Sequence, residues 1–189
     1  MGVEVPQKLK AGTTMTDYEF TLRFILPSSD VDMDELVDAL YEHGCDDALI
    51  GIGQPGRLGL DFTRTAASAR RALLSAIADV MKAIPGAALV EVSPDLVGLS
   101  DVATIFGRSR QNMRKLILSC PSTAPAPAHE GKSALWHLSS LLRWLEREKQ
   151  YEISPVLLDV AETTMQVNSA MSSLRSDPET ERELRNLLA

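Results

Sequence analysis

The chain has 189 residues, of which 44% are hydrophobic, and its formal net charge at neutral pH is −7. This length allows one or two domains with a substantial buried core. We see no apolar run of the roughly 18 residues that a membrane span needs, no secretory signal, and no disulfide framework in two widely separated cysteines. These features exclude a membrane protein or a small disulfide-rich scaffold, and they predict a cytoplasmic protein.

Charge is distributed unevenly along the chain. Residues 1–98 carry 8 basic and 15 acidic side chains, and residues 151–189 carry 3 basic and 7 acidic ones. Residues 99–150 carry 8 basic and 4 acidic side chains, a net charge of +4. Of these three segments, only the middle one would attract a polyanion.

The hydrophobic pattern changes near the same boundaries. We therefore expect a flexible leader at 1–16, an α/β domain at 17–97, a second domain at 98–150, and C-terminal helices at 151–189, which could serve dimerisation. Within 17–97 the expected elements are a strand at 18–26, a helix within 28–44, two strands within 47–64, a helix within 68–86 and a strand at 87–93. The order βαββαβ is that of a ferredoxin-like α/β sandwich.

The first of these helices follows an acidic stretch. Asp30 or Ser29 is expected to be its N-cap, and Gly44 is expected to end it. Its inward positions would be Met33, Leu36, Val37 and Leu40. The acidic residues lack the glycine and terminal glutamate of a calcium loop, so we interpret them as a solvated helix start. They are Asp30, Asp32, Asp34, Glu35 and Asp38.

The glycines Gly51, Gly53 and Gly56 match the spacing G-x-G-x-x-G of a dinucleotide-binding loop. That fingerprint requires the last glycine to open a helix whose N-terminus holds a pyrophosphate. Here the last glycine precedes a strand pattern, so we interpret the glycines as hairpin residues that need positive φ. We expect no cofactor.

Residues 99–118, "LSDVATIFGRSRQNMRKLIL", have the pattern of two short helices joined at a glycine. Ser100 is the expected N-cap of a first helix at 101–106, Gly107 ends it, and Ser109 caps the second. The positions expected to pack the helices together are Val102, Ala103, Phe106, Met113 and Leu116. A small residue, a glycine four positions later, and apolar residues six and nine after that glycine resemble a helix-turn-helix.

The outward positions of the second helix are polar and mostly cationic. Arginine binds guanine bidentately, glutamine binds adenine, and serine or lysine suits phosphate. With residues 109–119 as recognition helix, the expected DNA-binding residues are Arg108, Ser109, Arg110, Gln111, Arg114 and Lys115. Arg108 departs from the usual apolar turn residue and could reach a phosphate. The alternative interpretation is a solvated amphipathic helix.

The following segment consists of a proline-rich stretch, a turn at 130–132, a short strand at 134–138 and a helix from Ser139. With the preceding helix pair, this arrangement resembles the winged helix-turn-helix domains of the MerR, AlpA and excisionase-like group over about residues 98–149. The resemblance implies a wing that touches the DNA backbone or minor groove, a position matched by Lys132 and His129. Trp136 and Trp144 are expected in the core.

The C-terminal segment begins with Ser154 as N-cap and Pro155 at the first helical position. An apolar stripe follows at Val156, Val160, Thr164 (or Ala161), Val167, Met171 and Leu174. This stripe either packs on its own domain or forms the seam of a homodimer, because helix-turn-helix proteins usually read paired half-sites. A last helix is expected from Asp177 and Pro178.

These patterns predict an α+β protein with an N-terminal ferredoxin-like domain, a winged helix-turn-helix and C-terminal helices. The expected function is a sequence-specific transcriptional regulator that binds double-stranded DNA as a homodimer, with a protein partner or small effector at the N-terminal domain. We expect neither an enzyme nor a metal protein, because no metal-ligand spacing, nucleophile elbow or P-loop is present. The alternatives are an antitoxin-type module that neutralises a partner protein and an excisionase-like architectural factor.

Overall fold

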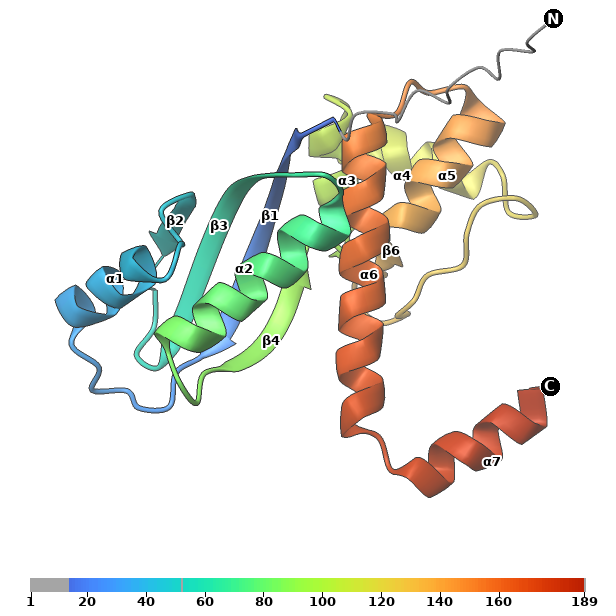
Figure 1. Cartoon of the computed structure of the whole chain (residues 1–189). Coiled ribbons are helices and arrows are strands. Elements are labelled where there is room, and N and C mark those ends of the chain that lie inside the picture. Colours follow the sequence, from blue (N-terminus) through green and yellow to red (C-terminus); the bar gives the residue numbers. More distant parts are fainter. Residues whose placement is uncertain (1–13, 52, 189) are drawn as a thin grey trace, which may run out of the picture.

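The computed structural model describes residues 14–51 and 53–188, and the first half of this α+β protein is built on a four-stranded antiparallel sheet (Figure 1). The strand order across the sheet is β2-β3-β1-β4. The elements are β1 (Thr16–Ile25), α1 (Met33–Glu42), β2 (Ala48–Gly51), β3 (Arg57–Ala66), α2 (Ala69–Ala83) and β4 (Ala88–Ser93). These elements and their order confirm the sequence prediction. The expected leader lies outside the described residues except for 14–16, and Thr16 already belongs to β1.

The alternation of β1 and β3 explains how the sheet buries one face. Tyr18, Phe20, Leu22 and Phe24 of β1 are buried, as are Leu58, Leu60 and Phe62 of β3. Phe20 and Phe62 are directly opposite each other, and their rings stack with centroids 5.3 Å apart. Helices α1 and α2 pack on this face, while the intervening residues of both strands point to the opposite, open face.

The start of α1 differs from the prediction. The expected N-cap, Asp30 or Ser29, is wrong, because Asp32 accepts hydrogen bonds from the backbone N–H groups two and three residues on, at 2.9 and 3.3 Å. The N–H of Asp30 is held by Ser28 in a turn of its own, so the chain enters the helix two residues later. Gly44, with φ of 87°, follows the helix end as predicted. Of the four expected inward positions, Leu36 and Leu40 are buried, and Met33 and Val37 are half-buried.

The turn glycines behave only in part as expected. Gly56, between β2 and β3, has the positive φ of 74° that the hairpin interpretation requires. Gly51 and Gly59 instead lie opposite each other in the β2–β3 ladder, with no positive φ. Because neither residue has a side chain, the open face of the sheet has a surface depression at this position.

A buried arginine ties the ends of these elements together. The Arg64 side chain on β3 is 9% exposed, and its guanidinium lies 2.7 Å from both Asp47 and Asp79. It also donates to the carbonyl of Gly44, at 2.7 Å, just after α1. Two carboxylates and a carbonyl satisfy the guanidinium, which makes its burial tolerable.

The second half of the chain forms a separate core. Its elements are β5 (Leu96–Val97), α3 (Leu99–Ile105), α4 (Arg110–Leu118), β6 (Trp136–His137) and α5 (Leu138–Lys149). The sequence did not predict β5, which pairs antiparallel with β6 through Leu96–His137 and Val97–Trp136. Trp136 and Trp144 are buried, as expected.

The last two helices are α6 (Pro155–Arg175) and α7 (Pro178–Leu188). Ser154 caps α6 as predicted. Most of its apolar stripe, namely Val156, Val160, Val167 and Met171, packs against the core of the sheet, while Ala161 belongs to the second core. The stripe is therefore used within the chain, although Leu174 is 87% exposed. Helix α7 buries no described residue and projects away from the body (Figure 1).

Asp95, which is 3% exposed, connects the two cores. One carboxylate oxygen lies 2.6 Å from Nδ1 of His137, and the other accepts from the amide of Asn168 at 2.8 Å. Its backbone carbonyl accepts from the N–H of Leu138 at 2.7 Å. The Asn168 amide also pairs with the N–H and C=O of Val92, at 2.9 and 2.7 Å. These hydrogen bonds join the end of β4, the middle of α6 and the start of α5.

In the described part of the chain, no helix has the length and apolar character needed to cross a membrane.

We predict that Asn168→Ala lowers the free energy of unfolding by about 2 kcal/mol, because the backbone of Val92 and the carboxylate of Asp95 lose partners in a half-buried position. Urea denaturation followed by circular dichroism measures this. Ser169→Ala, at the next and exposed position, is the matched control and should change stability by less than about 0.5 kcal/mol. Equal stability of the two variants would contradict the role given to Asn168.

Candidate nucleic-acid interface

Helices α3 and α4 are joined by a tight turn at Gly107. The glycine has φ of 59°, and the N–H of Arg108 donates to the carbonyl of Ala103 at 2.8 Å, closing the end of α3. The hydroxyl of Ser109 accepts from the N–H of Asn112 at 3.2 Å, so Ser109 is the N-cap of α4. Both features confirm the sequence prediction.

The start of α3 corrects the prediction that Ser100 is its N-cap. The N-cap is Gly98, whose N–H donates to the carboxylate of Asp101 at 2.8 Å. Pairing of β5 with β6 ends at Val97, so the chain turns into the helix at once and Ser100 falls inside its first turn. The carboxylate of Asp101 therefore supplies the cap from within the helix.

Apolar residues hold the two helices together. Val102, Ala103 and Met113 are buried as expected, whereas Phe106 and Leu116 are only half-buried. Ile117 is also buried, and the sequence analysis did not select it. Its position four residues after Met113 was the available signal, because residues i and i+4 share one helix face.

The opposite face of α4 is exposed and cationic. The structure places the predicted residues Arg108, Ser109, Arg110, Gln111, Arg114 and Lys115 at the surface. Positions 110 and 114, and positions 111 and 115, are one helical turn apart, so these four side chains share a face. The four cations of this region are Arg108, Arg110, Arg114 and Lys115. Within the described residues, none of them forms an ion pair or a side-chain hydrogen bond, unlike Arg143, which pairs with Glu162.

Lys132 lies at the tip of a separate short hairpin. His129 and Leu135 pair as an antiparallel bridge, with hydrogen bonds of 3.2 and 2.9 Å between their backbones. A Cβ added at Gly131 would lie 3.0 Å from Nε2 of His129, so glycine lets that ring fold over the turn. Trp136, just after the hairpin, belongs to the same core as α4, which anchors both parts of the candidate interface.

The two tryptophans fix the segment that joins α4 to the hairpin. The indole N–H of Trp136 donates to the carbonyl of Pro125 at 3.1 Å, and that of Trp144 donates to Thr123 at 3.3 Å. The proline-rich stretch cannot form a helix, so these bonds replace the regular backbone pairing it lacks. Both indoles thus contribute packing and positioning.

A cysteine that the sequence analysis left without a role lies just after the C-terminus of α4. Cys120 accepts from Nζ of Lys149, 2.8 Å away at the end of α5, and this contact, followed by one with Ser119, lowers the pKa of the thiol. The residues are far apart in sequence, so only the fold reveals the pair. The other cysteine, Cys45, is buried, and burial raises its pKa to about 11.

In the part of the chain that the structure describes, no group of three or more histidine, cysteine, aspartate or glutamate side chains is placed to hold a metal ion. Comparisons with protein-family models, with curated proteins and with solved structures give no match.

We predict that iodoacetamide modifies Cys120 well before Cys45 near neutral pH, because the thiolate is the nucleophile and the pKa of Cys120 is the lower one. Lys149→Ala removes the stabilising ammonium, so the pKa of Cys120 should rise and its alkylation at neutral pH should slow. Lys149→Arg keeps the charge and should preserve most of the rate. Mass spectrometry of the labelled peptides across a pH series measures both effects, and faster labelling of Cys45 would contradict the assignment.

Proposed function

We propose that the protein is a sequence-specific transcriptional regulator that reads double-stranded DNA with α4. The observation that carries this proposal is a group of four exposed cations without a partner among the described residues. Three of them, Arg110, Arg114 and Lys115, lie on α4, and Arg108 lies in the turn just before it. A recognition helix in a major groove places arginine and glutamine at base edges and its N-terminal residues against phosphates. In this role Arg110, Gln111 and Arg114 read bases, while Arg108, Ser109 and Lys115 bind phosphate.

Two further features support the finer fold assignment that accompanies this function. The strand order β2-β3-β1-β4, with a helix between β1 and β2 and another between β3 and β4, supports a ferredoxin-like first domain. The helix pair, the 129–135 hairpin and the β5–β6 pairing support a winged helix-turn-helix of the MerR, AlpA and excisionase-like group. In that arrangement the hairpin is the wing, and Lys132 touches the DNA backbone.

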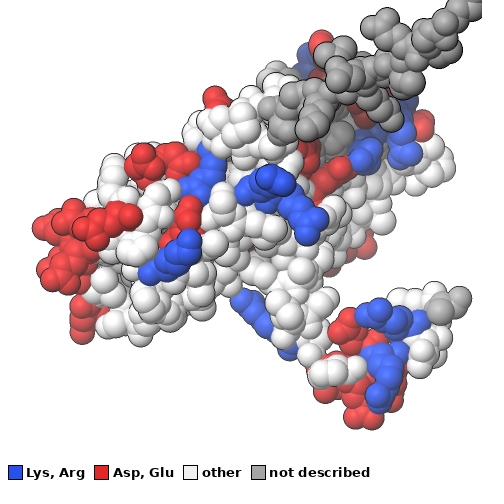
Figure 2. Space-filling view, in the orientation of Figure 1, with Lys and Arg blue, Asp and Glu red and all other residues white. Residues whose placement is uncertain are grey.

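The distribution of charge favours one direction of approach to DNA. Acidic side chains gather over α1 at one end of the molecule, whereas α4 lies toward the other end (Figures 1 and 2). At physiological salt the Debye length is about 8 Å, so the acidic end is screened from a duplex bound at α4. The net charge of −7 is therefore compatible with binding through one cationic face.

We predict that Arg110→Ala and Gln111→Ala each weaken binding to a duplex selected from a random pool by about 1–3 kcal/mol and relax the base preference at the contacted position. Lys132→Ala should weaken all sequences alike, as loss of a phosphate contact does. Fluorescence anisotropy over a salt series measures these effects. Arg70→Ala, at an exposed position on α2, is the control and should leave affinity unchanged.

Two outcomes would contradict the proposal. If the double variant Arg110→Ala with Gln111→Ala binds the selected duplex as tightly as the unmodified chain does, α4 is not the recognition helix. An affinity that does not fall with rising salt would exclude phosphate contacts, and with them DNA as the partner. The antitoxin-type alternative would then be the better one.

The same proposal includes a homodimer, because paired half-sites require two recognition helices. The stripe of α6 is occupied within the chain, so we assign the contact to α7, which exposes Leu184, Leu187 and Leu188. A chain ending at Ser176 should then sediment as a monomer while keeping its helical spectrum, and the full chain should sediment as a dimer. If the shortened chain and the full chain sediment in the same oligomeric state, α7 is not the interface.

A further inference from the structure

A cavity of about 710 Å³ lies where the sheet meets the second half of the molecule. Strands β1, β2 and β3 form one wall, Ile105 of α3 forms another, and Val156 and Leu157 at the start of α6 border it, while the rest opens to solvent. This volume is in the range of pockets that hold small organic molecules. The cavity is bounded by elements of both cores and by the first helix of the helix pair.

The sheet side of the cavity is acidic. Asp17 and Glu19 are two positions apart on β1 and so lie on one face, roughly 7 Å apart along the strand. Asp61 on β3 is diagonal to Glu19, because Glu19 is paired with Thr63. The hydroxyl of Thr65 donates to Asp17 at 2.5 Å, and that of Thr21 donates to Asp61 at 2.6 Å. These bonds orient the carboxylates without neutralising them.

The remaining walls are apolar. Leu49, directly opposite Asp61 in the β2–β3 ladder, is 73% exposed, and Ile105 is 39% exposed. No lysine, arginine or histidine lines the cavity among the described residues. The positive end of the α6 dipole, capped by Ser154, lies on the apolar side. A bound cation would therefore turn its charge to β1 and its apolar body to α3 and α6.

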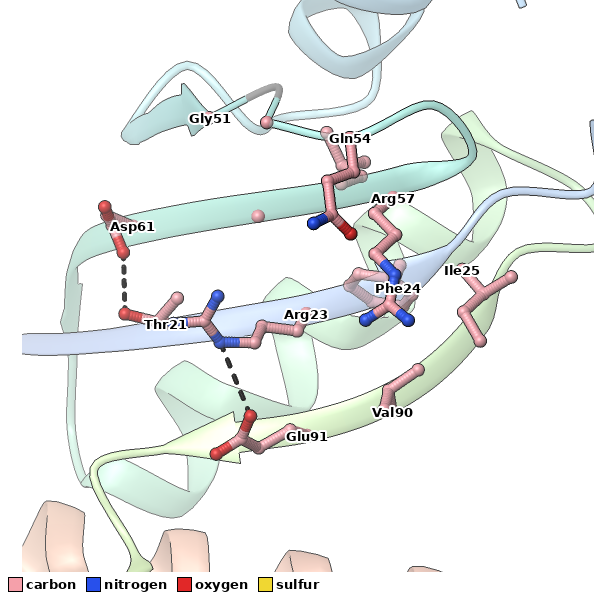
Figure 3. Close-up of a pocket in the computed structure, with 13 residues that line it drawn as sticks. Thr21, Arg23, Phe24, Ile25, Gly51, Gln54, Arg57, Asp61, Val90 and Glu91 are labelled. Carbon is pink, nitrogen blue, oxygen red and sulfur yellow. Dashed lines mark hydrogen bonds and ion pairs between the residues drawn. The ribbon is translucent and has the colours of Figure 1, made fainter. Parts of the chain in front are cut away.

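A second cavity on the same sheet face serves as an internal comparison (Figure 3). This trough of about 620 Å³ is lined by Arg23 and Arg57 as well as by Asp61 and Glu91, so its formal charges cancel. Arg23 on β1 pairs with Glu91 on β4 at 3.4 Å, the ion pair drawn as a dashed line in Figure 3. The trough therefore favours neither cations nor anions. Asp61 and Thr21 line both pockets, so the two adjoin, and Asp17 and Glu19 are the carboxylates that line the first cavity alone.

We propose that the cavity between the sheet and α3 binds a hydrophobic organic cation, such as an aromatic ammonium or phosphonium compound. Its carboxylates attract the charge, and Leu49, Ile105 and Leu157 cover the apolar body. Because Ile105 of α3 lines the cavity, a bound ligand changes the packing of α3, and through the turn at Gly107 the position of α4. This last effect rests on the proposed DNA-binding function, but the binding itself does not.

Tetraphenylphosphonium and tetraphenylborate test the proposal, since the two ions have nearly the same size and shape but opposite charge. Isothermal titration of the full chain should give saturable binding of tetraphenylphosphonium and none of tetraphenylborate. The double variant Asp17→Asn with Glu19→Gln should bind the cation roughly tenfold more weakly. The double variant Glu146→Gln with Glu148→Gln removes the same charge from the exposed face of α5 and should bind as the unmodified chain does.

Equal binding of both ions would show nonspecific apolar adsorption and overturn the proposal. Equal loss in the two double variants would show a general effect of net charge and would overturn it as well. Glu91→Gln, in the trough of Figure 3, should leave cation affinity unchanged, and a loss there would move the site to that trough. Titration needs no DNA, so failure of the DNA-binding proposal leaves this result interpretable.

Discussion

The buried carboxylate of Asp95 is the point on which the arrangement of the whole chain depends. It lies two residues after the end of β4, and its partners are His137 at the start of α5 and Asn168 in the middle of α6. A buried carboxylate without such partners would be strongly destabilising, so the three elements must meet at this position. The direction in which α3 and α4 leave the sheet domain is thereby fixed, since β5 begins at the next residue.

The two halves of the molecule hold Arg64 and the cations of α4 in opposite environments, the first buried and paired and the second exposed. In the sheet domain the buried cation Arg64 is satisfied by two carboxylates and a carbonyl, so its charge is used entirely for structure. On α4 the cations have hydrophobic residues beneath them and solvent above, so their charge remains available to a partner. The chain is acidic on average because the cationic surface is small, whereas acidic residues gather around α1 (Figure 2) and also occur on the other elements.

The sequence predicted those features whose cause is local. Alternation fixed the strands, and the caps at Ser109 and Ser154 and the glycines at 44 and 107 marked helix ends, because each acts within one turn. The exposed face of α4 followed from helical periodicity. The choice of Asp32 over Asp30, and of Gly98 over Ser100, depended on competing local bonds and on the β5–β6 pairing. The contact of Cys120 with Lys149, and the use of the α6 stripe by both cores, join distant residues and had no signal in the pattern.

The position of α6 has a consequence for how such a chain changes over evolutionary time. One helix places Val160 in the first core and the adjacent Ala161 in the second, so neither core is complete without it. A recombination event that transferred residues 98–150 alone would carry the cationic surface of α4 but leave part of the second core uncovered, because Ile153 and Ala161 belong to that core. Exchange of either half by itself would therefore disrupt a core, whereas substitutions at the exposed positions of α4 would leave both cores intact.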